Sequence, residues 1–506
     1  MNAHLPAPDA PLASIDMGSN SFRLEIGQVL QQRYRRLAYL KDTVRLGAGL
    51  DANGYLTEEA TQRGLESLRG FAHRLQGFGP GQVRAVATQT LREARNRNDF
   101  LARAETVLGF PIEVISGREE ARLIYAGVSF MQPARKPRLV IDIGGRSTEM
   151  ILGTGRTPGV AESFQVGSVS LSMRWFPDGA LTRQAFRDAE VAAGAEIEEA
   201  LGQFAPNRWE EALGSSGTAG AVSQILAGAG VSDGTITPAG LRWCIEQCLA
   251  AGHVDRLNLP TLKEDRKPVI AGGLALLYTL AMHFGLEELK PAKGALRQGV
   301  LIDLHERHEA RRGDQPGGRD LRDGSVSSLQ QRFGADPAQA ERVRLVALSL
   351  YEQLAQAQDA ADEALLELGW ACALHEVGMM VSHHDHHRHS AYLLAHADAP
   401  GFSQNQQRRM ADLVLGQRGG LRKLEAALAQ ERFAHQVLAL RLAVIKCHAR
   451  GPVHPGALSL KRSGRTVTVG SRRGWAEQNP RTAHLLRDEA EAWSRLGVLK
   501  LVLNLR

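Results

Sequence analysis

Ile15-Asp16-Met17-Gly18-Ser19-Asn20-Ser21 recurs later in the chain as Ile141-Asp142-Ile143-Gly144-Gly145-Arg146-Ser147. The two stretches share Ile, Asp, Gly and Ser at one constant offset, and the same offset joins Gly27 to Gly153 without a gap. A fixed spacing between similar segments is typical of duplicated structure. The sequence therefore predicts two related halves in this part of the chain.

Each copy predicts a strand, a loop and a second strand. Apolar strands from Leu12 to Ile15 and from Leu139 to Ile141 end at the Asp, and second strands follow from Phe22 to Val29 and from Thr148 to Leu152. We expect the glycines to permit a positive φ and to leave backbone N–H groups free to converge on an anion. An Asp at the strand end is suited to hold Mg²⁺ there. A plain hairpin turn is the alternative for one copy alone, and two copies in register favour a phosphate loop.

A third loop, Gly214-Ser215-Ser216-Gly217-Thr218, lies between the apolar pair Ala212-Leu213 and a helical stretch from Ala219 to Leu226. This order places small residues at the N-terminus of a helix. Free N–H groups and the helix dipole favour phosphate at such a position. The loop alone is weak evidence, and it gains weight beside the other two.

Composition sets limits on the kind of protein. The 506 residues exceed what one hydrophobic core accommodates, so we expect three or four domains. Lys and Arg number 61 against 55 Asp and Glu, and this charge of +6 favours an anionic partner. Aromatic residues make up only 5%, which argues against a protein that binds nucleic acid by stacking.

The chain lacks the signals of export and of membrane insertion. Its longest apolar runs, such as Leu274 to Leu280, fall short of the roughly 20 residues that span a bilayer. Residues 1–11 have neither the basic nor the apolar region of a signal peptide. The four cysteines include no C-x-x-C pair, so we expect reduced, buried thiols. We expect a cytoplasmic protein, with peripheral membrane association left open.

Several motifs together resemble the exopolyphosphatase/guanosine pentaphosphate phosphatase (Ppx/GppA) family, within the superfamily of sugar kinases, heat-shock proteins and actin. The resemblance runs from about Leu12 to the C-terminus. Beside the three loops, it is carried by Ala87-Thr88-Gln89-Thr90-Leu91-Arg92, Ile115-Ser116-Gly117-Arg118-Glu119-Glu120-Ala121-Arg122, Ser147-Thr148-Glu149 and Gly294-Ala295-Leu296-Arg297.

The resemblance implies an α/β protein with two actin-like (ribonuclease H-like) lobes, at 1–125 and 126–305. Gly and Arg concentrate near 311–319, so we place a linker at 306–320. Apolar residues spaced by three and four then predict a helical domain at 321–450, which resembles HD-type phosphohydrolases. A small C-terminal module is expected at 451–506.

The resemblance also implies a catalytic site. Glu120 matches the family glutamate that is thought to activate the attacking water, and Asp142 and Glu149 match its metal-associated carboxylates, here for Mg²⁺. The alternatives are an acid that complements a helix dipole for Glu120 and a cross-strand polar pair for Asp142 and Glu149. We expect the phosphate-binding residues to be Gly18, Ser19, Asn20, Ser21, Arg92, Gly144, Gly145, Arg146, Ser147, Ser216, Gly217 and Thr218; Arg266 and Lys267 are further candidates.

Two positions depart from the family pattern. Arg146 stands in the second loop where the family usually has Gly or Ala, and Arg23 replaces a residue that is often His. The Arg146 guanidinium is able to clamp a phosphate through two hydrogen bonds, or to fill the channel and lower turnover. Residue type alone leaves both readings open.

The predicted helical domain contains His375-Glu376 and a histidine cluster at 383–389. HD-type enzymes have His-Asp where this chain has His-Glu, and no earlier helix offers an obvious partner histidine. We therefore favour a scaffold over a working metal site, with contact to a long polyanion as a further reading. The basic segment from Lys461 to Arg473 offers the same contact or a solvated surface strand.

Together these features predict an exopolyphosphatase that acts on inorganic polyphosphate. The alternatives are a guanosine pentaphosphate (pppGpp) 5′-phosphohydrolase and a polyphosphate-binding regulator with weakened catalysis; a kinase ranks last. We expect a homodimer and no binding of a nucleic-acid duplex.

Overall fold

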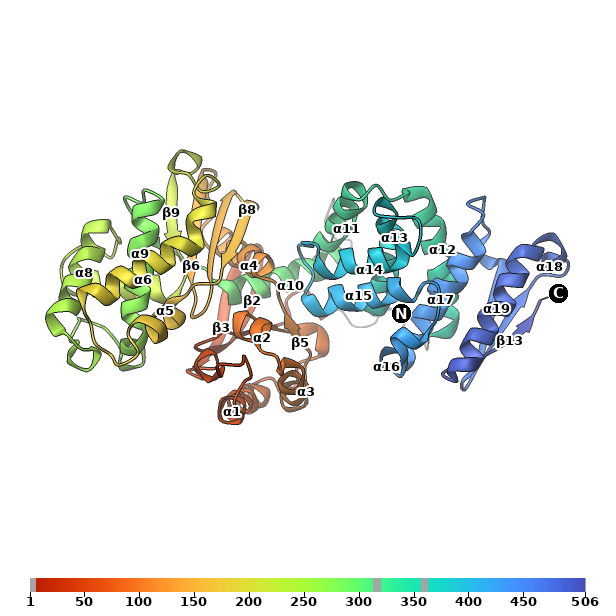
Figure 1. The fold of residues 1–506 in the computed structure, drawn as a ribbon, viewed down its shortest axis with the longest axis horizontal. Helices are drawn as coiled ribbons and strands as arrows, with labels where there is room; N and C mark the ends of the chain where they lie inside the picture. Colours follow the sequence, from red (N-terminus) through yellow and green to blue (C-terminus); the bar gives the residue numbers. More distant parts are fainter. Residues whose placement is uncertain (1–5, 313–319, 356–362, 506) are drawn as a thin grey trace. The chain divides into compact units, whose positions relative to one another are not determined.

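The computed structural model describes residues 6–312, 320–355 and 363–505. The chain divides into an N-terminal unit, Pro6–Gly318, and a C-terminal unit, Arg319–Arg506 (Figure 1). No helix among the described residues combines the length and the apolar character that crossing a membrane requires. All four cysteines are buried free thiols, as predicted.

The N-terminal unit contains two five-stranded sheets with the same strand order. The first runs β3-β2-β1-β4-β5, and the second, taken from its other edge, runs β8-β7-β6-β9-β10. The strands of the first sheet are β1 (Leu12–Met17), β2 (Phe22–Leu30), β3 (Arg33–Asp42), β4 (Val83–Ala87) and β5 (Ile112–Val114). Those of the second are β6 (Pro137–Ile143), β7 (Thr148–Thr154), β8 (Thr157–Phe164), β9 (Glu211–Gly214) and β10 (Lys290–Pro291).

The duplication predicted from the two loops extends to strand pairing. β1 pairs antiparallel with β2 and parallel with β4, and β6 pairs antiparallel with β7 and parallel with β9. The register shifts at Ile26/Gly27 in one sheet and at Leu152/Gly153 in the other. The predicted α/β fold with two ribonuclease H-like lobes is thereby confirmed.

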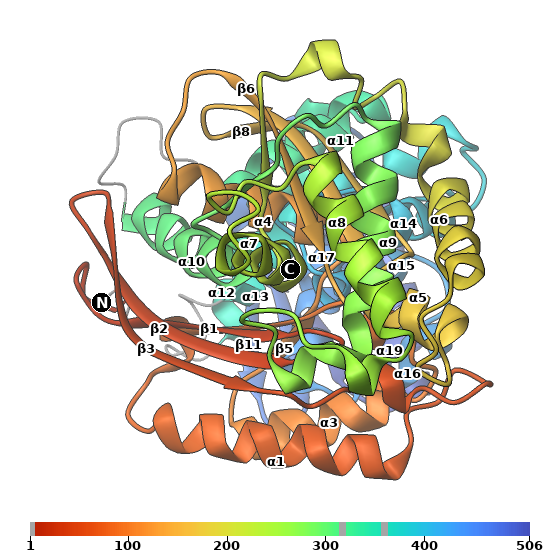
Figure 2. The ribbon, with the colours of Figure 1, turned by 90° about the vertical axis from the view of Figure 1, so that its left-hand side faces the viewer.

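Helices cover both faces of each sheet. In the first lobe, α1 (Glu58–Arg74) and α3 (Arg97–Leu108) lie on one face, as Figure 2 shows, and the short helix α2 (Gln89–Glu93) follows β4. In the second lobe one face carries α5 (Ser168–Trp175), α6 (Arg183–Ile197), α7 (Gly217–Gly228), α8 (Pro238–Ala251) and α9 (Lys267–His283).

Two further helices fill the space between the sheets. α10 (Leu296–Arg312) packs on the first sheet through Leu301 and Leu304, and α4 (Gly117–Met131) packs on the second sheet, on Val140 and Ile151. Because β1 and β6 alternate their side chains between two faces, Asp16 faces the α10 side and Asp142 the α4 side. The expected boundary at 125/126 falls inside α4.

The C-terminal unit is mainly helical and ends in a small sheet. Its helices are α11 (Leu321–Arg332), α12 (Pro337–Leu354), α13 (Glu363–Leu374), α14 (His386–His396), α15 (Gln404–Gly416), α16 (Glu425–Leu428), α17 (Glu431–Cys447), α18 (Trp475–Gln478) and α19 (Pro480–Leu496). The strands β11 (Leu458–Ser463), β12 (Thr466–Ser471) and β13 (Lys500–Asn504) form the sheet in the order β11-β12-β13.

Two expected boundaries differ from the observed ones. Residues 306–312 were expected in the linker and form the end of α10, and residues 313–319 lie outside the described residues. Val467 and Val469 of the terminal sheet belong to the same apolar core as α12 and α17. The sheet expected as a separate module at 451–506 is therefore part of one compact unit with the helices.

Candidate active site

An open cavity of about 770 Å³ lies between the two lobes of the N-terminal unit. The three predicted loops line it, through Gly18 to Ser21, through Gly144, Gly145 and Ser147, and through Ser215 to Thr218. Glu120, Asp142 and the cations Arg23, Arg266 and Arg297 complete much of the wall. The fold therefore brings together residues that are more than two hundred positions apart in the chain.

The glycines of the first two loops provide space, and the expectation of a positive φ was wrong. Gly18, Gly144 and Gly145 are absent from the positive-φ positions of the described chain. A Cβ on Gly144 would lie 3.0 Å from the Ser147 carbonyl oxygen, and one on Gly145 would lie 3.2 Å from Ser19 Cβ of the other lobe. The two loops therefore approach each other more closely than larger residues allow.

The third loop forms the N-terminus of α7, as predicted. The Ser216 hydroxyl caps the helix by accepting hydrogen bonds from the N–H groups of Thr218 and Ala219, both at 3.1 Å. A Cβ on Gly217 would lie 2.1 Å from Arg266 Nη2. Glycine at this position lets the Arg266 guanidinium lie against the helix start, where both groups favour an anion.

The first hairpin pairs an acidic side chain with a positively charged one. Asp16 and Arg23 are cross-strand partners on β1 and β2, and Arg23 Nη1 lies 2.8 Å from Asp16 Oδ2. Both side chains are largely buried. The carboxylate of this half therefore has its counter-charge within the hairpin.

The second hairpin pairs two acids at the equivalent positions. Asp142 and Glu149 are cross-strand partners on β6 and β7. Asp142 Oδ2 accepts a hydrogen bond from Ser215 Oγ at 2.6 Å, and Glu149 Oε1 accepts one from Ser163 Oγ at 2.8 Å. Burial raises the pKa of Asp142, and burial together with the charge of Glu120 raises the pKa of Glu149 well above its usual value. The pair therefore lacks the internal cation of the first hairpin.

Glu120 lies in the first turn of α4, close to this acid pair. Ser116 caps α4, and Arg92 Nη1 donates to Glu120 Oε2 at 2.8 Å. Burial raises the pKa of Glu120 to about 7, although Arg92 opposes the shift. A carboxyl group with this pKa is able to accept a proton near neutral pH.

The acid pair fits Mg²⁺ by its donor chemistry. Asp142 and Glu149 each accept a hydrogen bond from a serine hydroxyl, so oxygen atoms lie beside both carboxylates, and Mg²⁺ prefers oxygen ligands. No group of three or more His, Cys, Asp or Glu side chains that is arranged for a metal ion occurs in the part of the chain that is described. Mg²⁺ is commonly held by one or two carboxylates with substrate phosphates and water as the other ligands, and two carboxylates are present here.

Two predicted phosphate ligands point elsewhere in this structure. Beside its contact with Glu120, Arg92 donates to Gln89 Oε1 at 2.6 Å and to the Ile115 carbonyl oxygen at 3.0 Å. Arg146 Nη2 lies 2.8 Å from Glu93 Oε2, so the second loop is joined to α2 of the first lobe. Arg92 and Arg146 are therefore bound to neighbouring acids, and neither is part of the cavity wall.

A second cavity, strongly basic, overlaps the first. It is lined by five cations, which are Arg23, Lys41, Arg266, Lys293 and Arg297. Arg297 is held by the buried Glu25, whose Oε2 lies 2.5 Å from Arg297 Nε. Sequence reasoning left Arg297 without a role, although it ends the quoted motif Gly294-Ala295-Leu296-Arg297. Lys267, by contrast, pairs with the exposed Glu264 at 2.8 Å.

The histidine cluster of the C-terminal unit is partly buried. Burial lowers the pKa of His386 and His387 to about 4, so both rings are neutral near pH 7. His386 Nε2 lies 3.2 Å from Arg418 Nη1, and His375 Nδ1 lies 2.7 Å from the Cys372 carbonyl oxygen. Neutral rings do not attract a polyanion by charge. Beside His386, Arg418 is a side chain that stays positively charged.

Comparison with known proteins agrees with this architecture. The sequence model of the Ppx/GppA phosphatase family matches residues 26–308, and that of Ppx/GppA phosphatase domain III matches residues 321–490. An exopolyphosphatase structure from Cytophaga hutchinsonii is 23% identical, with a TM-score of 0.54, over 59% of this chain and 98% of its own. An exopolyphosphatase-like protein is 25% identical, with a TM-score of 0.53, over 59% of this chain and 99% of its own.

A Ppx/GppA family member from Aquifex aeolicus has a TM-score of 0.50 and 23% identity, over 60% of this chain and 99% of its own. These structural likenesses support the fold alone. Of the two sequence matches, the first lies in the N-terminal unit and the second in the C-terminal unit. The resemblance inferred from the motifs is therefore confirmed, and the chain belongs to the Ppx/GppA phosphatase family of hydrolases.

Proposed function

We propose that this phosphatase is an exopolyphosphatase, which removes the terminal phosphate of inorganic polyphosphate. The observation that carries the proposal is the continuity of two cavities. The loop-lined cavity with Glu120 opens into the basic cavity, and they share Arg23, Arg266 and Arg297. A chain of phosphates carries charge along its whole length, so it suits a site whose cations continue beyond the reacting end.

The reaction proceeds by attack of water on the terminal phosphorus. Glu120 accepts a proton from the water as its oxygen bonds to phosphorus. The bridging P–O bond breaks, its electron pair stays on the shortened chain, and orthophosphate leaves. Backbone N–H groups near Ser19, Gly145 and Gly217 stabilise the charge on the phosphoryl oxygens, because they are already placed before the substrate arrives.

Arg92 has a supporting role in this scheme. Its contact with Glu120 at 2.8 Å orients the carboxylate and favours the ionised form that accepts a proton. Burial acts in the opposite direction and keeps the group basic enough to react near pH 7. The balance gives a base that works under neutral conditions.

Mg²⁺ is the cofactor that we propose, held by Asp142 and Glu149. When bound, it would neutralise the buried acids and the phosphate oxygens beside them. The first hairpin contributes Arg23 for the same purpose, because this cation is built into the chain. Each half of the site therefore places a cation beside the substrate, and in the first half Asp16 balances the charge of that cation.

Two alternatives fit the same site less well. For pppGpp, a cavity that also receives a base and a ribose is needed, and the second cavity is lined mainly by cations and small residues. For a regulator without catalysis, a buried base close to two further acids has no purpose. Polyphosphate is therefore the substrate that the charges favour.

The test is a phosphate-release assay with one preparation and two substrates, long-chain polyphosphate and pppGpp, at saturating Mg²⁺. We expect a higher kcat/KM on polyphosphate, with orthophosphate as the released product. A higher value on pppGpp would replace the proposal by the nucleotide phosphatase. Tight binding of polyphosphate without release of phosphate would support the regulator.

A further inference from the structure

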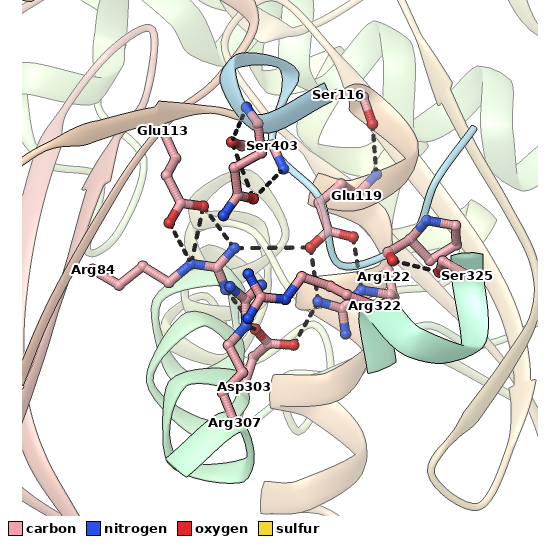
Figure 3. Close-up of polar contacts among 12 residues, drawn as sticks. Arg84, Glu113, Ser116, Glu119, Arg122, Asp303, Arg307, Arg322, Ser325 and Ser403 are labelled. Atoms are coloured by element: carbon pink, nitrogen blue, oxygen red, sulfur yellow. Dashed lines mark hydrogen bonds and ion pairs between the residues drawn. The ribbon is translucent and has the colours of Figure 1, made fainter. Parts of the chain in front are cut away.

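A buried network of charges lies beside the catalytic turn of α4 (Figure 3). Glu119 and Glu120 are neighbours in the chain but have different partners: Glu119 contacts Arg122, whereas Glu120 contacts Arg92. Consecutive residues of a helix point in different directions, so one turn faces both the cavity and the network. The proposed function uses Glu120 and leaves Glu119 without a role.

The contacts of Glu119 link α4 to two other elements. Arg122 Nε donates to Glu119 Oε2 at 2.7 Å, and Arg122 Nη2 donates to Asp303 Oδ1 of α10 at 2.7 Å. Arg84 of β4 donates to Asp303 Oδ2 at 2.6 Å and lies 4.0 Å from Glu119 Oε1. A strand of the first lobe and the two helices between the lobes therefore meet through these four side chains.

Further contacts extend the network at its edges. Glu113 of β5 accepts from Arg84 Nη2 at 2.9 Å, and Arg307 of α10 donates to Asp303 Oδ2 at 2.8 Å. Three guanidinium groups thus face three carboxylates. The charge of Arg307 and then that of Arg122 hold the pKa of Asp303 far below its usual range. The acid therefore stays ionised under all ordinary conditions.

The network is deeply buried, and burial restricts how its charged side chains can be arranged. The exposed fraction of the side chain is 3% for Arg84, 1% for Glu119 and 6% for Asp303. Removing one member of such a set leaves its partner charged and unpaired in a poorly solvated place. The side chains consequently tolerate few other arrangements of β4, α4 and α10.

Backbone packing reinforces the same arrangement. A Cβ on Gly299 of α10 would lie 1.7 Å from the Leu123 carbonyl oxygen of α4, and one on Gly127 would lie 2.4 Å from the Ala295 carbonyl oxygen. The two helices thus touch backbone to backbone. The glycines fix the distance between the helices, and the charges fix how the first turn of α4 lies against β4.

We propose that Glu119, held by Arg84, Arg122 and Asp303, is a positioning residue that sets the place of the Glu120 carboxylate in the cavity. The proposal rests on the proposed function, in which Glu120 is the base. Because Glu120 follows Glu119 directly, a shift or rotation of this turn moves the base relative to the substrate. A misplacement of about 1 Å at a reacting group lowers the rate by about 10²-fold.

The surroundings of Glu120 make such a movement measurable. Arg92 approaches from α2, Asp16 from β1, Asp142 from β6 and Glu149 from β7, and burial is the largest influence on the Glu120 pKa. Each of these effects depends on the place of the carboxylate. A carboxylate that moves toward solvent therefore titrates at lower pH.

The first test replaces Glu119 by Gln in the full-length chain. We expect kcat on a short polyphosphate to fall by about 10²-fold with KM within about twofold of wild type, because the base moves and the substrate loops stay in place. The acid limb of the kcat profile should move to lower pH. Wild-type kcat and an unchanged profile in a folded Glu119→Gln protein would overturn the proposal.

Two further variants separate positioning from loss of stability. Glu489→Gln breaks the pair of Arg441 and Glu489 in the C-terminal unit, which is equally buried and joined at 2.5 Å. It should lower the thermal midpoint and leave kcat and its pH profile unchanged. Glu119→Asp keeps the charge with a shorter side chain, and it should recover about half of the lost activity on a logarithmic scale, so its kcat should lie between those of Glu119→Gln and the wild type. If Glu119→Gln does not fold, Glu119→Asp decides alone. A Glu119→Asp protein with a lowered thermal midpoint and a wild-type kcat would overturn the proposal.

An infrared titration makes the result independent of turnover. The Glu120 carboxyl signal is obtained as the difference between a protein and its Glu120→Gln counterpart, in the wild-type and Glu119→Asp backgrounds, because Glu119→Gln would lower the Glu120 pKa through the lost charge alone. A lower Glu120 pKa in the second background supports positioning, and an equal pKa contradicts it. A wild-type protein that releases no phosphate would refute the proposed function, and the titration would still decide whether Glu119 places Glu120.

Discussion

The two duplicated hairpins place different charges at the same position. In the first lobe the strand-end acid Asp16 faces Arg23 across the hairpin, and in the second lobe Asp142 faces Glu149. The backbone features around them agree, including the register shifts at Gly27 and Gly153. One scaffold therefore carries a neutralised half and an acidic half, and the difference lies in a single cross-strand residue.

The contrast explains how a site made by duplication becomes asymmetric. A built-in cation in the first lobe favours binding of an anion, whereas two buried acids in the second lobe need a metal ion or protons. Glu120 lies close to the acidic half, and burial, followed by the charges of Asp16 and Asp142, raises its pKa against the opposing effect of Arg92. In the proposed mechanism, catalysis therefore belongs to one side of the cavity and anchoring of the substrate to the other.

The largest expected effect comes from the base itself. Glu120→Gln keeps the size of the side chain and removes its ability to accept a proton, so kcat should fall by roughly 10²–10⁴-fold, with little change in KM. Steady-state phosphate release measures both constants. Activity within twofold of wild type would remove Glu120 from the mechanism and the acidic half from the chemistry.

The next effect compares the same change in both hairpins. Asp142→Asn should raise the Mg²⁺ concentration for half-maximal rate by about tenfold or more, because loss of a group that merely supports a ligand commonly costs about 10–100-fold in metal affinity, and loss of a ligand should cost at least as much. Asp16→Asn should leave this concentration within about threefold and act on KM, since it frees Arg23.

Titration of activity with Mg²⁺ separates the two variants, and EDTA should abolish hydrolysis by the wild-type protein. Equal shifts in the Mg²⁺ requirement of Asp16→Asn and Asp142→Asn would mean that the halves do not divide their roles as described. Full activity in excess EDTA would remove Mg²⁺ from the account.

A third effect concerns stability and pH in the absence of Mg²⁺. An unfolded glutamate titrates near about 4.3, whereas burial raises the pKa of Glu120 to about 7 and that of Glu149 well above its usual value. The folded protein therefore binds more protons between these values, so the free energy of unfolding is greatest below about pH 4 for these groups and falls as pH rises through 7.

We accordingly expect the thermal midpoint without Mg²⁺ to contain a component that falls between pH 5 and 8, and Mg²⁺ to reverse it at pH 8. Glu149→Gln should reduce this component because one of the buried acids is gone. Calorimetry at matched ionic strength measures it. A slope unchanged by both Mg²⁺ and Glu149→Gln would contradict the view of the second hairpin as an unneutralised acid pair.

The smallest effect is expected at Arg146, which joins the two lobes. Arg146 and Glu93 are each about one quarter exposed, and partly exposed ion pairs contribute about 1 kcal/mol or less. Arg146→Gly and Glu93→Gln should therefore change kcat and KM by less than about fivefold, and by similar amounts. A large rise in KM for Arg146→Gly alone would restore the phosphate clamp, and a rise in kcat would favour a plug.

The sequence predicted the structure best where a local pattern of residue types also determines the local backbone. The paired loops at Asp16 and Asp142 predicted two related lobes because their spacing reflects the order of strands, and the sheets have that order. The loop at Ser216 predicted a helix start because small capping residues are favoured there. The cavity walls formed by these loops were thus accessible from local patterns.

Other features depend on partners that are distant in the chain. The departure of Arg146 from the family pattern suggests a clamp or a plug, and the resemblance assigns Arg92 to phosphate. In the structure Arg146 pairs with Glu93 of the other lobe and Arg92 pairs with Glu120, which follows only after β5. The glycine of the second loop was explained by φ, whereas the approach of Ser19 explains Gly145. Long charged side chains reach several neighbours, and only the fold selects one.

The most direct measurement follows the oxygen atom of the attacking water. Hydrolysis of long-chain polyphosphate by the wild-type protein in ¹⁸O-labelled water, with Mg²⁺, should place one ¹⁸O atom in each released orthophosphate and none in the shortened chain, because water bonds to the terminal phosphorus. Label in the remaining chain, or phosphate passed to a second acceptor without label, would contradict the account.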